Sequence, residues 1–145
     1  MFDIASFGFS MATIKNFEDL EIWQKAIDIA DQLYDLCMND QVKKDFSLQD
    51  QLKRAAISIS NNIAEGFEYN NNADFIKFLR YAKGSCGECR SMIGFMKRRK
   101  WISKEDHDEF YTSLKNLGAQ IGSFMSYLRK TTTKTRNKQL VISNP

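Results

Sequence analysis

Apolar residues recur at three- and four-residue steps through most of this chain, a spacing typical of helices that bury one face. The pattern covers four segments, at residues 17–39, 48–67, 72–99 and 104–130. Each segment starts with a capping residue followed three positions later by an acid: Asn16 and Asp19, Ser47 and Asp50, Asn71 and Asp74, Ser103 and Asp106. Such pairs satisfy the first amides of a helix and favour its positive end. The sequence therefore predicts four helices.

The predicted core stripes alternate three- and four-residue steps, as the seams of left-handed bundles do. In the first helix they are Leu20, Trp23, Ile27, Ala30, Tyr34 and Cys37. In the second they are Leu52, Ala55, Ile59 and Ile63, and in the third Phe75, Leu79, Ala82, Cys86, Cys89, Ile93 and Met96. In the fourth they are Phe110, Leu114, Leu117, Ile121, Phe124 and Leu128. Short connections favour antiparallel neighbours, so we expect an all-α, up-and-down four-helix bundle.

The length of 145 residues fits one domain. We place the bundle at residues 16–130 and expect a flexible extension at residues 1–15. Residues 131–145 lose the apolar pattern and are rich in Thr, Lys and Asn. We expect them to form a disordered, basic tail.

The second helix carries a polar stripe beside its core stripe. This stripe consists of Gln51, Arg54, Ser58, Asn62 and Glu65. A surface helix does not require such a stripe, so it indicates a polar, specific interface. A hairpin turning near residue 69 would set it against Gly84, Ser85 and Glu88 of the third helix, with Arg54 and Glu88 within reach of an ion pair, inside a subunit or between subunits. Because no activated nucleophile or base lies beside these residues, packing or assembly is favoured over catalysis.

Three ordered motifs carry a family resemblance. They are Phe17-Glu18-Asp19-Leu20-x-x-Trp23-x-x-Ala26, the segment QLKRAAISISNNIAEG at residues 51–66, and Phe78-Leu79-x-x-Ala82-x-Gly84-Ser85-x-x-Glu88. Over residues 16–130 the chain resembles the four-helix bundle proteins encoded in intervening sequences of bacterial 23S ribosomal RNA genes. It departs from them mainly at Cys86, Cys89, the asparagines at 70–72 and the residues before Met11.

The resemblance implies a bundle that assembles into a ring, usually a pentamer. A related branch serves diversity-generating retroelements, where a basic barrel binds nucleic acid and the reverse transcriptase. The motif residues that the resemblance places at packing and subunit interfaces are Arg54, Ser58, Asn62, Glu65, Gly66, Gly84, Ser85 and Glu88.

Charge is distributed unevenly although the net charge is only +3. Residues 17–40 hold seven acids against one lysine, and residues 72–100 hold eight bases against two acids. On the third helix, one third of the circumference carries Arg80, Lys83, Arg90, Lys97 and Arg98. This stripe is about 27 Å long and predicts contact with the backbone of RNA or DNA, without sequence preference. The alternative is an ordinary solvated face.

The remaining candidate chemistry is weak. Cys86 and Cys89 form a C-x-x-C pair in core register within a helix, so we interpret them as buried packing residues. Zinc would need four ligands, and only Cys37 and His107 remain; we predict no metal and no cofactor. His107 is expected to be exposed. No apolar run reaches the length of a membrane span, and no signal peptide is recognisable, so we expect a cytoplasmic protein with reduced thiols.

Two functional hypotheses follow. The first is a non-enzymatic homo-oligomer that binds structured RNA or DNA. The second is a protein-interaction or assembly module with no nucleic-acid role. Self-association is expected in both, because apolar residues lie off the core stripes of the second and third helices. These residues are Ile57, Ala64, Tyr81, Met92 and Phe95.

Overall fold

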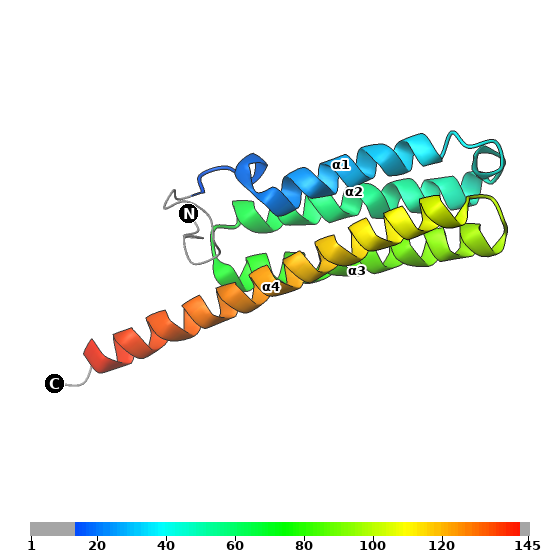
Figure 1. Cartoon of the computed structure of the whole chain (residues 1–145). Helices are drawn as coiled ribbons and strands as arrows, with labels where there is room; N and C mark the ends of the chain where they lie inside the picture. Colours follow the sequence, from blue (N-terminus) through cyan, green and yellow to red (C-terminus); the bar gives the residue numbers. More distant parts are fainter. Residues whose placement is uncertain (1–13, 143–145) are drawn as a thin grey trace.

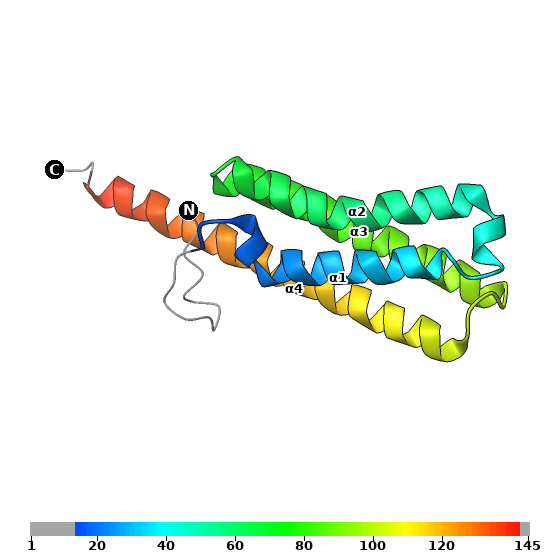
Figure 2. The same cartoon turned by 90° about the horizontal axis from the view of Figure 1, so that it is seen from above.

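The computed structural model describes residues 14–142, and the side chains of residues 14–136. It is an all-α, antiparallel four-helix bundle, as predicted (Figure 1). The helices are α1 (Glu21–Leu36), α2 (Phe46–Glu68), α3 (Asn72–Arg98) and α4 (Lys104–Ile142), with short 3-10 turns η2 (Phe17–Asp19) and η3 (Val42–Lys44) before α1 and α2. Helix α3 packs against α2 and α4, and α1 packs against α2 and, less extensively, α4 (Figure 2). Residues 1–13 of the predicted extension and 143–145 of the predicted tail lie outside the described residues.

Two of the four predicted helix starts are confirmed. The side-chain oxygen of Asn71 accepts from the amide of Asp74 at 2.9 Å, and the hydroxyl of Ser103 accepts from the amide of Asp106 at 3.0 Å. Asn70 adopts a left-handed conformation, with φ of 55°, that closes the α2–α3 turn. Asparagine tolerates this conformation better than most residues, which explains part of the asparagine run at this turn.

The other two predicted starts are wrong. Helix α2 begins earlier than predicted, and its first turn is capped by Asp45, whose carboxylate accepts from the amide of Leu48 at 2.9 Å. Ser47 therefore lies inside the helix. Asn16 precedes only η2 and makes no side-chain cap, and α1 starts after Leu20. In both places a 3-10 turn precedes the helix and determines which residue occupies the capping position.

The core confirms the stripes predicted for α2 and α3, whose residues are all buried, and most of the stripe for α4. On α1 the predicted stripe is partly wrong, because Ile27 and Tyr34 are exposed. The buried residues of α1 and its end are instead Ile22, Ala26, Ile29, Ala30, Leu33 and Cys37. Both sets recur at helical spacing, and packing against α2 and α4 selects between them.

Helix α4 continues to Ile142, twelve residues beyond its predicted end. Residues 131–142 are therefore helical, and the expectation that the chain loses regular structure at residue 131 is wrong for them. The apolar pattern does end there, because this part of α4 extends past the ends of the other helices (Figure 1). No helix in the described part of the chain has the length and apolar character needed to cross a membrane.

Helices α2 and α3 approach each other closely at Gly66. A methyl group there would come within 2.7 Å of Phe78 Cβ and 2.9 Å of Phe75 Cδ2. At Gly94 of α3 nothing lies within 4 Å of the same position. Glycine is thus required at the first site by packing and not required at the second.

We predict that Gly66→Ala lowers the free energy of unfolding by roughly 1–3 kcal/mol, because the added methyl group forces the two phenylalanines apart. Gly94→Ala is the control, and it should raise the free energy of unfolding by up to about 1 kcal/mol through higher helix propensity. Urea denaturation followed by circular dichroism measures both. Equal stability of the two variants would contradict the close packing.

Candidate functional site

A hydrogen-bonded cluster joins α2 to α3 at the polar motif residues. The hydroxyl of Ser85 donates to Ser58 Oγ at 2.9 Å. Asn62 Nδ2 donates to Ser58 Oγ at 2.9 Å and to the Ser58 carbonyl at 2.7 Å. Ser85 is buried, and Ser58 and Asn62 are partly buried. This part of the polar stripe therefore fixes the α2–α3 pair within one subunit, because each buried polar group has a partner.

The other motif residues lie on the surface. Arg54 Nε binds Asp50 Oδ2 at 2.8 Å, and both side chains are largely exposed. The anticipated pair between Arg54 and Glu88 is thus not formed within the subunit, because Asp50 lies one helical turn away on the same face. An exposed pair of this kind contributes little to stability. Glu65 and Glu88 are exposed, as is Gly84.

Aromatic side chains form a ridge beside these residues, which we call the aromatic ridge and define as Tyr69, Phe78, Tyr81 and Phe95. Tyr69 stacks on Phe78 with ring centroids 5.2 Å apart, and Phe78 meets Tyr81 edge-on at 5.9 Å. Tyr69, Tyr81 and Phe95 are each about half exposed, at 53%, 49% and 48%. Large apolar groups gathered on one surface commonly mark an interaction site.

The predicted basic stripe lies on the other side of α3, next to α4. Arg80, Lys83, Lys97 and Arg98 are exposed. Lys83 reaches across to α4, with its Nζ 3.3 Å from the position of a methyl group on Gly122. We call these bases, together with Arg90 and the exposed Lys115 of α4, the basic seam.

Arg90 and Lys115 come from facing helices and share one aromatic partner. The Arg90 guanidinium lies 5.5 Å from the ring centroid of Tyr111, and Lys115 Nζ lies 5.9 Å from it. Arg90 is half-buried, and its Nε has no hydrogen-bond partner among the described residues. The seam is therefore formed by two helices, and the contribution of Lys115 was not identified from the sequence.

Carboxylates do not neutralise the seam. In the described part of the chain the ion pairs join Lys25 to Glu21, Lys43 to Asp40, Arg54 to Asp50 and Lys104 to Asp108, and the His107 ring contacts Asp108 at hydrogen-bond distance. None of these pairs includes a residue of the seam. Lys97 lies near one acid: hydrogen bonds from Lys104 and His107, followed by the charges of Lys104 and Lys97, lower the pKa of Asp108 to about 2.

His107 corrects another expectation. Its side chain is only 15% exposed, because the ring stacks on Tyr111 with centroids 5.6 Å apart and Nδ1 lies 2.8 Å from Asp108 Oδ1. The ring thus serves to pack the first turns of α4. Among the residues that the structure describes, no three His, Cys, Asp or Glu side chains are grouped so that they could hold a metal ion.

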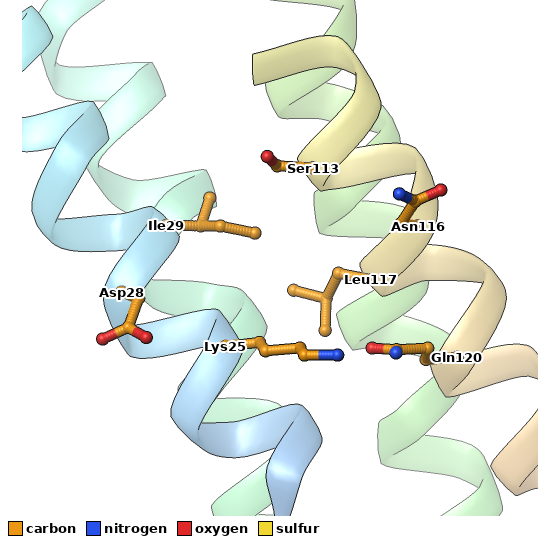
Figure 3. A pocket seen from close by; sticks show the side chains of 7 residues that line it. All are labelled: Lys25, Asp28, Ile29, Ser113, Asn116, Leu117 and Gln120. Atoms are coloured by element: carbon orange, nitrogen blue, oxygen red, sulfur yellow. The ribbon is translucent and has the colours of Figure 1, made fainter. Parts of the chain in front are cut away.

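A cleft of about 260 Å³ between α1 and α4 was not predicted (Figure 3). Lys25, Asp28 and Ile29 line it from α1, and the residues from α4 are Ser113, Asn116, Leu117 and Gln120. Gln120 Oε1 is buried without a hydrogen-bond partner among the described residues. The cleft offers an acceptor and space for water, but it contains no pairing of a nucleophile with a base. Its residues are far apart in the sequence, so spacing gave no signal for it.

These features define an all-α bundle protein whose candidate functional regions are the basic seam and the aromatic ridge. The model of the 23S rRNA-intervening sequence protein family matches residues 18–123, and the chain belongs to this family. A crystal structure of a protein of unknown function from the S23 ribosomal protein family of Bacteroides thetaiotaomicron has the same fold. Its TM-score is 0.66 at 23% identity, and the match covers 72% of this chain and 97% of that one. No curated protein matches the chain.

Burial confirms that Cys86 and Cys89 belong to the core. Desolvation raises the pKa of each thiol to about 12, and the neighbouring charges of Cys86 and Glu88 add to the rise at Cys89. Thiolate, the reactive form, is therefore disfavoured in the folded chain.

We predict that the free energy of unfolding decreases as the pH rises above 9.0, the ordinary pKa of these thiols. Unfolded thiols then ionise while folded thiols stay protonated, so protons are released on unfolding and the unfolded state is favoured. The variant with Cys86→Ala and Cys89→Ala should be roughly 1–3 kcal/mol less stable at neutral pH and should lose less stability on going to about pH 10.5. Denaturation series at several pH values test this. Parallel pH profiles for the two proteins would contradict it.

Proposed function

We propose that this protein is a non-enzymatic homo-oligomer that binds the phosphate backbone of structured RNA or DNA through the basic seam. The observation that carries the proposal is the set of bases on facing sides of α3 and α4 that form no ion pair with the carboxylates of the described residues. Lys and Arg side chains arranged in this way attract phosphates and release counterions on binding.

The composition of the seam favours recognition of backbone over sequence. Its polar groups are ammonium and guanidinium groups, which bind phosphate whatever the adjacent base. Gly87 and Gly94 lie between the bases on α3, and open space surrounds the position of a side chain at both. A nucleic-acid backbone can thus approach the helix closely.

Self-association would use the aromatic ridge. The ridge lies on the α2 side of α3 and the seam lies on the α4 side, so the two surfaces do not compete for the same residues. An assembly through the ridge would present several seams at once and raise the affinity for a long polyanion. The family resemblance favours a ring, usually a pentamer, as the form of that assembly.

The alternative is a protein-interaction or assembly module with no nucleic-acid role. The exposure of Tyr69, Tyr81 and Phe95 supports it as well. The two functions differ in what the seam does, and this makes charge reversal in the seam the deciding experiment.

We predict that reversing Arg80, Lys83 and Lys97 to Glu weakens binding to a labelled RNA hairpin by about a hundredfold or more at low salt. The salt dependence of the affinity should flatten by about one unit for each phosphate that the variant no longer neutralises. Changing the RNA sequence should have little effect. Fluorescence anisotropy over a salt titration measures each quantity. All three residues are exposed, so the fold should survive, which circular dichroism checks.

The matched control reverses Lys43, Lys44 and Lys53, which lie in η3 and on α2 and do not belong to the seam. It makes the same change in net charge and should reduce the affinity far less. If the wild-type protein binds neither RNA nor DNA at low salt, the nucleic-acid role is wrong and the interaction module is favoured. If control and seam variant weaken binding equally, attraction is nonspecific and the seam is not the site.

We also predict a mass well above the 16.8 kDa of one chain in light scattering. Tyr81→Glu together with Phe95→Glu should lower that mass, because two charges in an apolar interface would lose their hydration on assembly. Met38→Glu, at a residue 71% exposed in the α1–α2 connection, is the control and should leave the mass unchanged. A monomeric wild-type protein at micromolar concentration would exclude the oligomer.

A further inference from the structure

The last part of α4 projects from the bundle as a helical arm, which we define as residues 129–142 (Figures 1 and 2). Every side chain described in it, from residue 129 to residue 136, is exposed. The family match ends at residue 123, before the arm begins. Neither the shared bundle core nor the family match accounts for this segment.

The arm belongs to a stretch of strongly one-sided charge. Residues 110–145 contain no Asp or Glu. Their bases are Lys115, Arg129, Lys130, Lys134, Arg136 and Lys138. Without carboxylates in this stretch, the positive potential continues from the bundle along the arm.

Helical register aligns part of the arm with the basic seam. Positions 115, 122, 129 and 136 are seven residues apart, and each step turns an α-helix by about 20° from a straight line, so the row drifts by about 60° over its length. Arg129 and Arg136 lie about 20° and 40° around the helix from Gly122. Lys115 and Gly122 of this row already lie in the seam, the latter under Lys83. Arg129 and Arg136 therefore continue the seam along α4. Lys130 and Lys134 lie about 80° and 120° from Gly122, in the opposite direction around the helix.

Contacts at the base of the arm fix its direction. Asn72 Nδ2, in the first turn of α3, donates to the Leu128 carbonyl at 3.3 Å and to Thr132 Oγ1 at 3.0 Å. Arg136 lines a groove of about 320 Å³ together with Asn72, Thr132 and Thr135. The arm thus leaves the bundle beside the start of α3, in a defined orientation.

The helical state of the arm changes its expected contribution to binding. A disordered tail would give up conformational entropy on docking, whereas a helix is already ordered. The threonine hydroxyls are satisfied within the helix by donating to carbonyls four residues earlier, as Thr131 does to Tyr127 at 3.0 Å and Thr133 does to Arg129 at 3.1 Å. Contacts made by Arg129 and Arg136 should therefore match those of the bundle in strength.

We propose that the arm extends the basic seam into one binding surface for double-stranded nucleic acid, with Arg129 and Arg136 as its outer phosphate contacts. The inference rests on the proposed function of the seam and specifies its ligand. The row from residue 115 to residue 136 is about 32 Å long at 1.5 Å per residue. At about 3.4 Å per base pair of DNA this length corresponds to a duplex of about nine base pairs.

A duplex fits this row better than a single strand does. Proteins that bind single strands usually stack the bases on exposed aromatic rings. On this side of the bundle the ring of Tyr111 is 38% exposed, but it is already contacted by Arg90, Lys115 and the stacked ring of His107. The aromatic ridge is on the opposite side of α3. The row therefore presents cations to a regular backbone.

The test compares full-length wild-type protein, Arg129→Glu with Arg136→Glu, and the matched control Lys130→Glu with Lys134→Glu. The control makes the same charge change in the same arm on different sides of the helix. Affinities are measured by fluorescence anisotropy for labelled RNA duplexes of about 8 and about 16 base pairs, and for a single strand of the longer length. Circular dichroism and light scattering accompany each variant.

We expect the Arg129 and Arg136 variant to bind the longer duplex about tenfold more weakly, with a salt slope lower by about two, and the control to change either value much less. The reduction should be smaller for the shorter duplex, which can remain on the seam. The wild-type protein should prefer the longer duplex to the single strand.

Different failures have different meanings. If the wild-type protein binds no nucleic acid, the proposed function fails and this inference fails with it. If seam reversal abolishes binding while both arm variants behave alike, the seam is the site and the arm is not. A lower assembly mass for the Arg129 and Arg136 variant would instead make the arm an assembly segment and overturn the proposal.

Discussion

Burial of one stripe along α3 is the constraint on which the other features depend. Phe75, Leu79 and Ile93 are fully buried, and the Phe75 ring meets Phe67 of α2 at 6.0 Å and Phe124 of α4 at 5.3 Å. Because α3 is held between two neighbouring helices, two flanks of its surface remain exposed. One flank lies beside α2 and the other lies beside α4. The aromatic ridge occupies the first flank and the basic seam occupies the second. Their separation follows from the position of α3 in the bundle.

Polar groups are used differently on the two flanks. On the flank beside α2, a partly buried cluster of hydrogen bonds joins Ser85, Ser58 and Asn62. These polar groups therefore position α3 against α2. Beside α4 the bases pair with no carboxylate of the described residues, and their charge is left for an external anion. The carboxylates are concentrated instead around α1 and the start of α4. A bundle with small net charge thus carries a marked charge polarity, which favours a polyanionic partner on one side.

The sequence predicted the part of the candidate site that lies on a single helix. Arg80, Lys83 and Arg90 follow helical spacing on α3, and their common flank was expected from that spacing alone. Lys115 was not, because its place beside Arg90 depends on the register between α3 and α4. The absence of acids after residue 109 was visible in the sequence. Without the helix that continues to Ile142, however, it indicated only a basic tail.

The sequence by itself determined the number and order of the helices, the stripes on α2 and α3, and the capping at Asn71 and Ser103, because these depend on interactions within a few residues. Tertiary structure decided which of two periodic stripes of α1 faces the core, which left Ile27 and Tyr34 exposed. It also decided that Lys115 of α4 lies beside Arg90 of α3. These outcomes depend on how the helices are rotated and aligned against one another. Contacts between residues far apart in the sequence set that alignment, and the spacing of residues within one helix does not reveal it.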